Sequence, residues 1–234
     1  MRYLIAFISM LITCANLHSQ TYEVGPFIGG ANYIGDVGKT NYINPNSLVA
    51  GGVFKWNRST RHAFRFSLLV GKIKANDLDS DDNRRKERGY SFSNTIAEAS
   101  LGLEFNFWDF DLNKQSPQNT PYLYTGVTYF MADHISLGNT RTGPLQKANE
   151  KNWNFAIPLV IGWKTSLSKH LIGGLEIGAR YTFTDNLDGS NPEEFTGKLD
   201  SVTTFGNSGR NDWYVFTGLT FTVTFGRKPC YFRF

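Results

Sequence analysis

The chain is poor in cysteine and has no long apolar run. Two of its 234 residues are cysteine, Cys14 and Cys230, so a disulfide framework like that of small secreted domains is excluded. The apolar segment at residues 3–13 is too short to span a membrane as a helix. Together with a mean hydropathy of -0.31, this argues against a helical membrane protein.

The chain also has only a small excess of positive over negative charge. The chain has 24 Lys and Arg against 20 Asp and Glu, a net charge of +4, which is too small to indicate a nucleic-acid partner. No basic run is interleaved with stacking aromatic residues either. Aromatic residues make up 15% of the chain, which suits a protein with aromatic girdles at a membrane interface.

The N-terminus has the pattern of a secretory signal peptide. Arg2 precedes the apolar segment, and cleavage near Ser19-Gln20 gives a signal over residues 1–19. Residues 11–14 weakly resemble a lipoprotein box, but Thr13 is a poor residue before the cysteine, so lipidation of Cys14 stays open. Once the signal is removed, only Cys230 remains and no intramolecular disulfide can form.

Residues 212–225 alternate without a break. The odd-numbered positions from Trp213 to Phe225 are mainly apolar. The last three even-numbered positions are polar, namely Thr220, Thr222 and Thr224. A period of two marks a β-strand with a different environment on each face. At about 3.3 Å per residue, such a strand can cross a bilayer when tilted.

The same alternation recurs along the chain and predicts eight strands. The expected fold is all-β, an eight-stranded antiparallel transmembrane β-barrel with up-and-down topology over residues 20–225. The alternative is a soluble β-sandwich or lipocalin-like barrel, whose strands also alternate. The predicted strands are residues 22–34, 47–56, 62–73, 95–107, 121–131, 154–164, 171–183 and 212–225.

The connections between these strands alternate in length. Residues 57–61 and 165–170 form short turns, whereas the other hairpin set, residues 35–46, 74–94, 132–153 and 184–211, is longer and polar. Short periplasmic turns and long outer loops are the rule for outer-membrane barrels. One connection, residues 108–120, should be periplasmic but is longer than a tight turn. It is either a docking element or a loop without a role.

Aromatic residues fall near the predicted strand ends, where amphipathic rings prefer the membrane–water interface. Residues 226–234 form a tail that is expected to lie in the periplasm. Its Phe234 resembles the C-terminal aromatic that marks many barrels for assembly, although Phe225 ends the last predicted strand. The interfacial aromatics are Trp56, Trp108, Trp153, Trp163, Trp213, Tyr22, Tyr122, Tyr181 and Tyr214.

No catalytic, metal or cofactor site is predicted. His62, His134 and His170 are far apart in sequence, and no Ser/His/Asp grouping has a diagnostic context. The acidic run at residues 77–82 would need a glycine and a glutamate where Asp82 and Arg88 stand to form an EF-hand. A solvated outer loop whose acids pair with residues 84–88 is favoured instead.

The inward-facing charges are more informative. An eight-stranded barrel is just wide enough for side chains to fill it, so charges of mixed sign should pair and plug it. A narrow ion path is the alternative. If Ile73 faces Thr95, Arg65 lies opposite Leu103 and beside Glu104, and these two charges are expected to pair. The predicted lumen network consists of Arg65, Glu98, Glu104, Glu176 and Arg180.

Three segments resemble a known family. Residues 22–36, Tyr-Glu-Val-Gly-Pro-Phe-Ile-Gly-Gly-Ala-Asn-Tyr-Ile-Gly-Asp, resemble the opening of the PorG-like outer-membrane proteins of Bacteroidetes. Residues 91–98 and 120–127 resemble the beginnings of two later strands. The resemblance implies a component of the type 9 secretion system that associates with a periplasmic ring of PorK (GldK in gliding species) and PorN (GldN). It carries over no catalytic residues, cofactor or small-molecule substrate.

The expected function is therefore that of an outer-membrane anchor for a secretion machine. The barrel is expected to contact membrane lipid. On the periplasmic side, it is expected to contact its partner through the aromatic residues Trp108, Phe110, Tyr231 and Phe232. The alternative is a small OmpA-like surface barrel for adhesion or envelope stability, which would act through its outer loops. A lipid-modifying barrel enzyme would need a catalytic set that is not visible.

Overall fold

The computed structural model describes residues 21–114, 116–136, 146–190, 205 and 211–226. Its eight strands form one closed antiparallel barrel in which each strand pairs with its sequence neighbours and β1 pairs with β8. The strands are β1 (Thr21–Ile34), β2 (Ser47–Asn57), β3 (His62–Asn76), β4 (Ser91–Asn106), β5 (Asn119–Ser136), β6 (Gln146–Ser166), β7 (Leu171–Thr182) and β8 (Trp213–Gly226).

All eight predicted strands are present, and the up-and-down topology is confirmed. The largest differences lie at the end where the long hairpins project. There β4 begins at Ser91 rather than residue 95, and β6 begins at Gln146 rather than residue 154. The antiparallel ladder continues past the apolar residues, through a register irregularity between Asp133 and Ile135, because main-chain hydrogen bonds do not require apolar side chains.

Two short helices interrupt the connection between β3 and β4. They are η1 (Asp77–Asp79) and α2 (Asn83–Arg88). The side chain of Asp82 caps the first turn of α2, and Gly89 ends it with a left-handed backbone, φ 68°. Neither of these helices of the described residues has the length and apolarity needed to cross a membrane.

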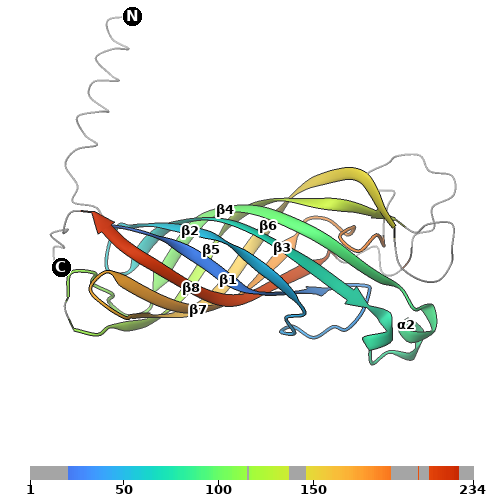
Figure 1. Ribbon diagram of the computed structural model, residues 1–234, viewed down its shortest axis with the longest axis horizontal. Helices are drawn as coiled ribbons and strands as arrows, with labels where there is room; N and C mark the ends of the chain where they lie inside the picture. Colours follow the sequence, from blue (N-terminus) through green and yellow to red (C-terminus); the bar gives the residue numbers. More distant parts are fainter. Residues whose placement is uncertain (1–20, 115, 137–145, 191–204, 206–210, 227–234) are drawn as a thin grey trace, which may run out of the picture.

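The two ends of the barrel differ. Figure 1 shows α2 at one end and the tip of β8 at the other. The pairing of Thr21 with Gly226 places the beginning of β1 beside that tip. The long hairpins therefore project at the α2 end, called the outer end, and the short turns lie at the opposite, periplasmic end.

The exterior is apolar between these ends. On β3 exposed and buried positions alternate from His62 to Lys74, and the exposed ones include Phe64, Leu68 and Val70. Large apolar side chains with this outward exposure occur on every strand, and a water-soluble protein would not leave such a band uncovered. Representative members are Ile28, Leu48, Phe66, Leu101, Val127, Leu159, Ile161, Leu175, Leu219 and Val223.

Aromatic pairs lie toward both ends of this exterior. Trp108 and Trp163 meet edge to face with ring centroids 5.3 Å apart, and Tyr129 stacks on Trp153 at 5.1 Å. Trp153 lies within β6 rather than at its end, because β6 begins earlier than predicted. The interfacial assignment is wrong for Tyr122 and Tyr214, which are buried in the lumen because their positions have inward parity.

Candidate functional site

The five charged residues that the alternation predicts to point inward are all buried. Arg65 lies on β3, Glu98 and Glu104 on β4, and Glu176 and Arg180 on β7. None of the five exposes more than 3% of its surface. The barrel thus brings side chains of the neighbouring strands β3 and β4 together with those of β7, which pairs with neither of them.

Glu104 is the centre of one cluster. Lys55 of β2 approaches its Oε2 atom to 2.7 Å, and Lys164 of β6 approaches its Oε1 atom to 2.6 Å. The guanidinium of Arg65 lies farther away, at 3.8 Å. The expected register was wrong by one residue, since Arg65 faces Gly102 rather than Leu103. The close partners of Glu104 are therefore two lysines.

Arg65 instead forms a two-pronged ion pair across the lumen. Its Nη1 and Nη2 atoms each donate to a carboxylate oxygen of Glu176 at 2.7 Å. The hydroxyl of Tyr122 donates to the same carboxylate at 2.5 Å, and the ring of Tyr124 lies 4.8 Å from the Arg65 guanidinium carbon. Parallel donors match the planar carboxylate, so this geometry fixes both side chains.

A second ion pair lies nearer the outer end. Arg180 donates from Nη2 to Glu98 at 2.9 Å, and Tyr214 donates to the other oxygen of Glu98 at 2.7 Å. Another nitrogen of Arg180 donates to the Gly178 carbonyl at 2.7 Å. The ring centroid of Phe216 lies 4.4 Å from the guanidinium carbon, so the charge is enclosed by acceptors and aromatic surface.

The lumen charges balance. Four buried cations, Lys55, Arg65, Lys164 and Arg180, equal the buried glutamates of the strands in number, and three of those glutamates form ion pairs. Glu23, the fourth carboxylate, accepts hydrogen bonds from Asn57 and Thr222, each at 2.9 Å. Buried charges are tolerated only when they are paired and hydrogen-bonded. This arrangement fills the barrel.

Lys55, Lys164 and Glu23 were not among the predicted lumen residues. Each occupies an inward position on its strand, so extending the same parity rule to β1, β2 and β6 would have found them. Among the described residues, no group of three or more His, Cys, Asp or Glu is placed to hold a metal ion.

The outer end of the barrel is closed by its loops. Val37 and Leu187, from two different loops, belong to the buried apolar cluster that also contains Phe130 and Phe216. Asp77 accepts hydrogen bonds from the Gly38 N–H at 2.8 Å and from Arg88 at 2.7 Å. The expectation of a solvated loop is wrong for Asp77, which is fully buried because it joins two loops.

A pair of buried acids lies beneath this cap. The Tyr33 hydroxyl donates to Oδ1 of Asp212, and the Leu187 N–H donates to Oδ2 at 2.8 Å. Burial, reinforced by the charge of nearby Asp188, raises the pKa of Asp212 well above its ordinary value. Burial also raises the pKa of Asp188. Both carboxyls therefore hold protons more strongly in the folded cap than in an unfolded chain.

The periplasmic end is closed by the connection after β4. The Phe110 N–H donates to the Thr60 carbonyl at 3.1 Å, and the Lys164 ammonium lies 5.0 Å from the Phe110 ring. The expectation of an exposed Phe110 is wrong, since it is 3% exposed and fills the mouth of the barrel. Trp108 is half exposed and packs against the ring of Trp163. Tyr231 and Phe232 lie outside the described residues.

A closed eight-stranded barrel with an apolar exterior and a filled, charged interior is a transmembrane β-barrel of the outer membrane. Lipid contacts its exterior. The chain belongs to the family described as "Domain of unknown function (DUF6089)", whose model matches residues 2–233. No curated protein matches the sequence.

Solved outer-membrane barrels resemble the chain over most of its length. Ail, the attachment invasion locus protein of Yersinia pestis, has a TM-score of 0.46 and 7% identity, covering 88% of this chain and 99% of its own. The N-terminal β-barrel domain of Pseudomonas aeruginosa OprF gives 0.44 and 10%, covering 89% and 98%. Neisserial surface protein A gives 0.40 and 10%, covering 88% and 95%. The class assigned above rests on the barrel's own geometry.

Proposed function

We propose that this barrel is an outer-membrane component of a type 9 protein secretion machine and contacts a periplasmic ring of the PorK/GldK and PorN/GldN type. The proposal starts from the resemblance of residues 22–36, 91–98 and 120–127 to the PorG-like proteins. Its functional form is that of an anchor, which binds the ring while the barrel stays in the membrane.

The filled lumen is the observation that carries the anchor role. Arg65, Tyr122 and Lys55 are among the largest fully buried side chains and occupy the interior, and an eight-stranded barrel has no further room for a polypeptide. A role in secretion must therefore come from contact. Planar-bilayer recordings check this directly: we expect no steady conductance, and stable open channels would contradict the anchor role.

Affinity purification from the native outer membrane tests the partner. We expect the ring proteins to co-purify with the tagged barrel and to be lost from Trp108→Ser, which changes an exposed periplasmic aromatic. Leu78→Ser, at an exposed position of the outer loop, is the matched control. The folded barrel is verified in each variant by its heat-modifiable migration. If only the Leu78 variant loses the ring proteins, the contact lies at the outer end and the proposed periplasmic anchor is wrong.

A small OmpA-like surface barrel for adhesion or envelope stability is the second candidate. The structured outer end favours it, because Arg85 donates to the Gly38 carbonyl at 2.7 Å and Arg88 donates to the Asp36 carbonyl at 2.7 Å. Those bonds hold the loops in one arrangement, as a binding surface requires. Loss of adhesion in Leu78→Ser cells with normal secretion would favour this candidate.

A further inference from the structure

A hollow of about 240 Å³ opens at the periplasmic mouth of the barrel. Three parts of the chain surround it. Lys114 comes from the connection after β4, Lys169 and His170 come from the turn between β6 and β7, and Thr21 and Thr224 come from the seam where β1 meets β8. It is therefore built where the barrel closes on itself.

The two lysines at this hollow have no acidic partner among the described residues. Both are exposed, and no carboxylate there lies within ion-pair distance of either ammonium. The acids nearby in sequence are engaged elsewhere: Asp109 pairs with Arg61 at 2.7 Å, and Asp111 accepts the Asn113 N–H at 2.9 Å. His170 adds a ring that can donate or accept a hydrogen bond. The hollow is thus complementary to an anion.

Hydrogen bonds hold the walls of the hollow in place. The Gln118 side chain donates to the Asp111 carbonyl at 2.6 Å and accepts from the Asp111 N–H at 2.8 Å. The Ser166 N–H donates to the Gln118 carbonyl at 2.9 Å, and the Thr224 N–H donates to the His170 carbonyl at 2.8 Å. Walls fixed before binding reduce the entropy that a ligand must offset.

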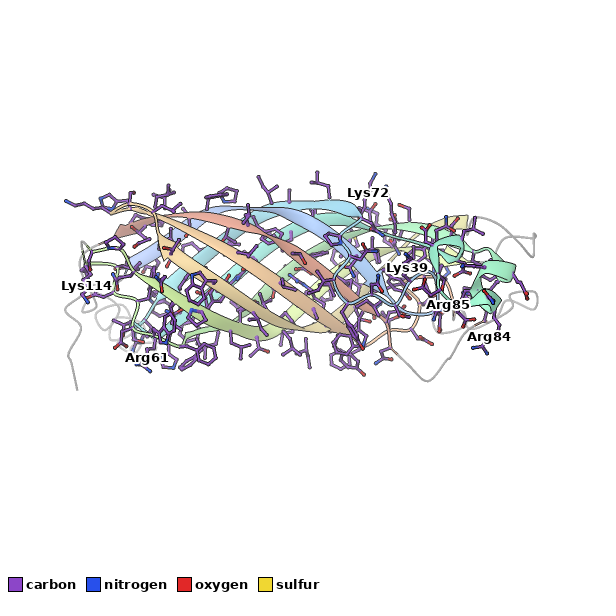
Figure 2. All side chains as sticks on the ribbon, turned by 90° about the horizontal axis from the view of Figure 1, so that it is seen from below. Lys39, Arg61, Lys72, Arg84, Arg85 and Lys114 are labelled. Atoms are coloured by element: carbon purple, nitrogen blue, oxygen red, sulfur yellow. The ribbon has the colours of Figure 1, made fainter. Side chains whose placement is uncertain are left out.

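The hollow faces the aqueous periplasm. Thr21 and Thr224 are buried and have inward parity, so they lie at the lumen side of the rim rather than on the lipid-facing side. Figure 2 shows Lys114 at the end of the molecule opposite to Lys39, Arg84 and Arg85. Phe225, which also lines the hollow, faces outward, so the hollow lies at the rim, and the charged side chains that line it at the end of the barrel are within reach of a soluble partner.

We propose that Lys114, Lys169 and His170 form a docking site for an acidic peptide segment of a periplasmic protein, whose carboxylates take the place of the missing acidic partners. This site would give a partner of the proposed anchor an acidic segment as its point of contact. It depends on the proposed function only for the identity of that partner. The chain's own residues 227–234 carry three basic side chains, Arg227, Lys228 and Arg233, and no acidic side chain, so charge does not favour them as the occupant.

Binding of a synthetic peptide to the purified full-length barrel in phosphatidylcholine nanodiscs tests the site. The probes are a fluorescent Asp/Glu-rich peptide and its Asn/Gln counterpart, measured by anisotropy. We expect only the acidic peptide to bind, more weakly at about 1 M than at about 0.15 M salt, since the Debye length falls from about 8 Å to about 3 Å.

The double variant Lys114→Gln/Lys169→Gln should raise the Kd of the acidic peptide about tenfold, as expected for two exposed charge pairs. Lys39→Gln/Lys86→Gln makes the same charge change at the outer end and should leave the Kd unchanged. Both variants change exposed or half-exposed side chains, and heat-modifiable migration verifies that they are folded. Equal Kd values for wild type and the Lys114/Lys169 variant would overturn the site.

Two other occupants have distinct outcomes. If phosphatidylglycerol in the nanodisc abolishes peptide binding to wild type, the hollow is a headgroup site and the proposal is wrong. If deleting residues 227–234 strengthens peptide binding about tenfold or more, the tail is the native occupant, which also overturns it. No ring protein is present in these measurements. Peptide binding with failed ring co-purification would therefore contradict the proposed function while keeping the site.

Discussion

Arg65 and Glu176 meet in the middle of the barrel although β3 and β7 stand four strands apart, on opposite sides of the closed sheet. Two hydrogen bonds of 2.7 Å join them, and neither side chain exposes more than 3% of its surface. A contact of this kind ties the two halves of the barrel wall together. It also occupies the space through which an ion or a peptide would pass.

Breaking this pair from one side should cost more than removing it. We expect Arg65→Met or Glu176→Gln alone to lower the free energy of unfolding by about 3–5 kcal/mol. Each substitution leaves the charge of the other residue buried without its partner. The double variant should lose less than either single variant, because it leaves neither charge buried alone. Denaturant unfolding of the barrel in lipid vesicles measures all four forms. Additive losses would show that the two residues are not coupled.

Gly162 should be intolerant of a larger residue. A Cβ atom there would lie 2.3 Å from the Tyr122 ring, and that ring is held in place by its bond to Glu176. We expect Gly162→Ala to cost about 1–3 kcal/mol, the usual effect of overpacking. Gly52→Ala is the control, because the nearest atom to its added Cβ is 3.9 Å away. Similar unfolding curves for both variants would contradict the tight contact.

The outer cap should weaken as pH rises. Burial raises the pKa of both Asp188 and Asp212, whereas an unfolded aspartate titrates near about 3.9. The folded cap therefore binds more protons, and its stability is fully present below that value and is lost as pH rises through the folded pKa values.

Hydrogen exchange at Leu187, whose amide donates to Asp212 at 2.8 Å, reports this change. The protection factor, which removes the intrinsic pH dependence of exchange, should fall with pH in the wild type. Asp188→Asn removes one of the two acids and should flatten the fall. A protection factor that rises with pH, or an unchanged slope in the variant, would show that the acids do not control the cap.

Cysteine labelling checks the orientation. In a Cys230→Ser background, Leu78→Cys should react with an impermeant maleimide on intact cells, since Leu78 is exposed at the outer end. Ser116→Cys, exposed in the connection after β4, should react only after the outer membrane is opened. The reverse pattern would place α2 in the periplasm and would remove the basis for both proposals.

Strand positions and inward charges were predictable because alternation is a local property of the sequence. Arg65, Glu98 and Arg180 could be assigned to the lumen from parity alone. Their closest partners could not, since Arg65 reaches Glu176 across the barrel at 2.7 Å, whereas the predicted partner Glu104 lies at 3.8 Å. Phe110 was misplaced for a different reason. Its connection has no period, and the bond from its N–H to Thr60 depends on the closed barrel.

Site-specific photocrosslinking in native cells tests most directly whether the barrel acts through its periplasmic end. A photoreactive residue is placed at Ser116 or at Leu167, which is exposed in the turn after β6, and at Leu78 or Glu87 on the outer loop as matched controls. We expect crosslinks to the PorK/GldK or PorN/GldN type of ring protein from the first two positions and none from the other two. Ring crosslinks confined to Leu78 and Glu87, or absent from all four positions, would contradict the anchor function.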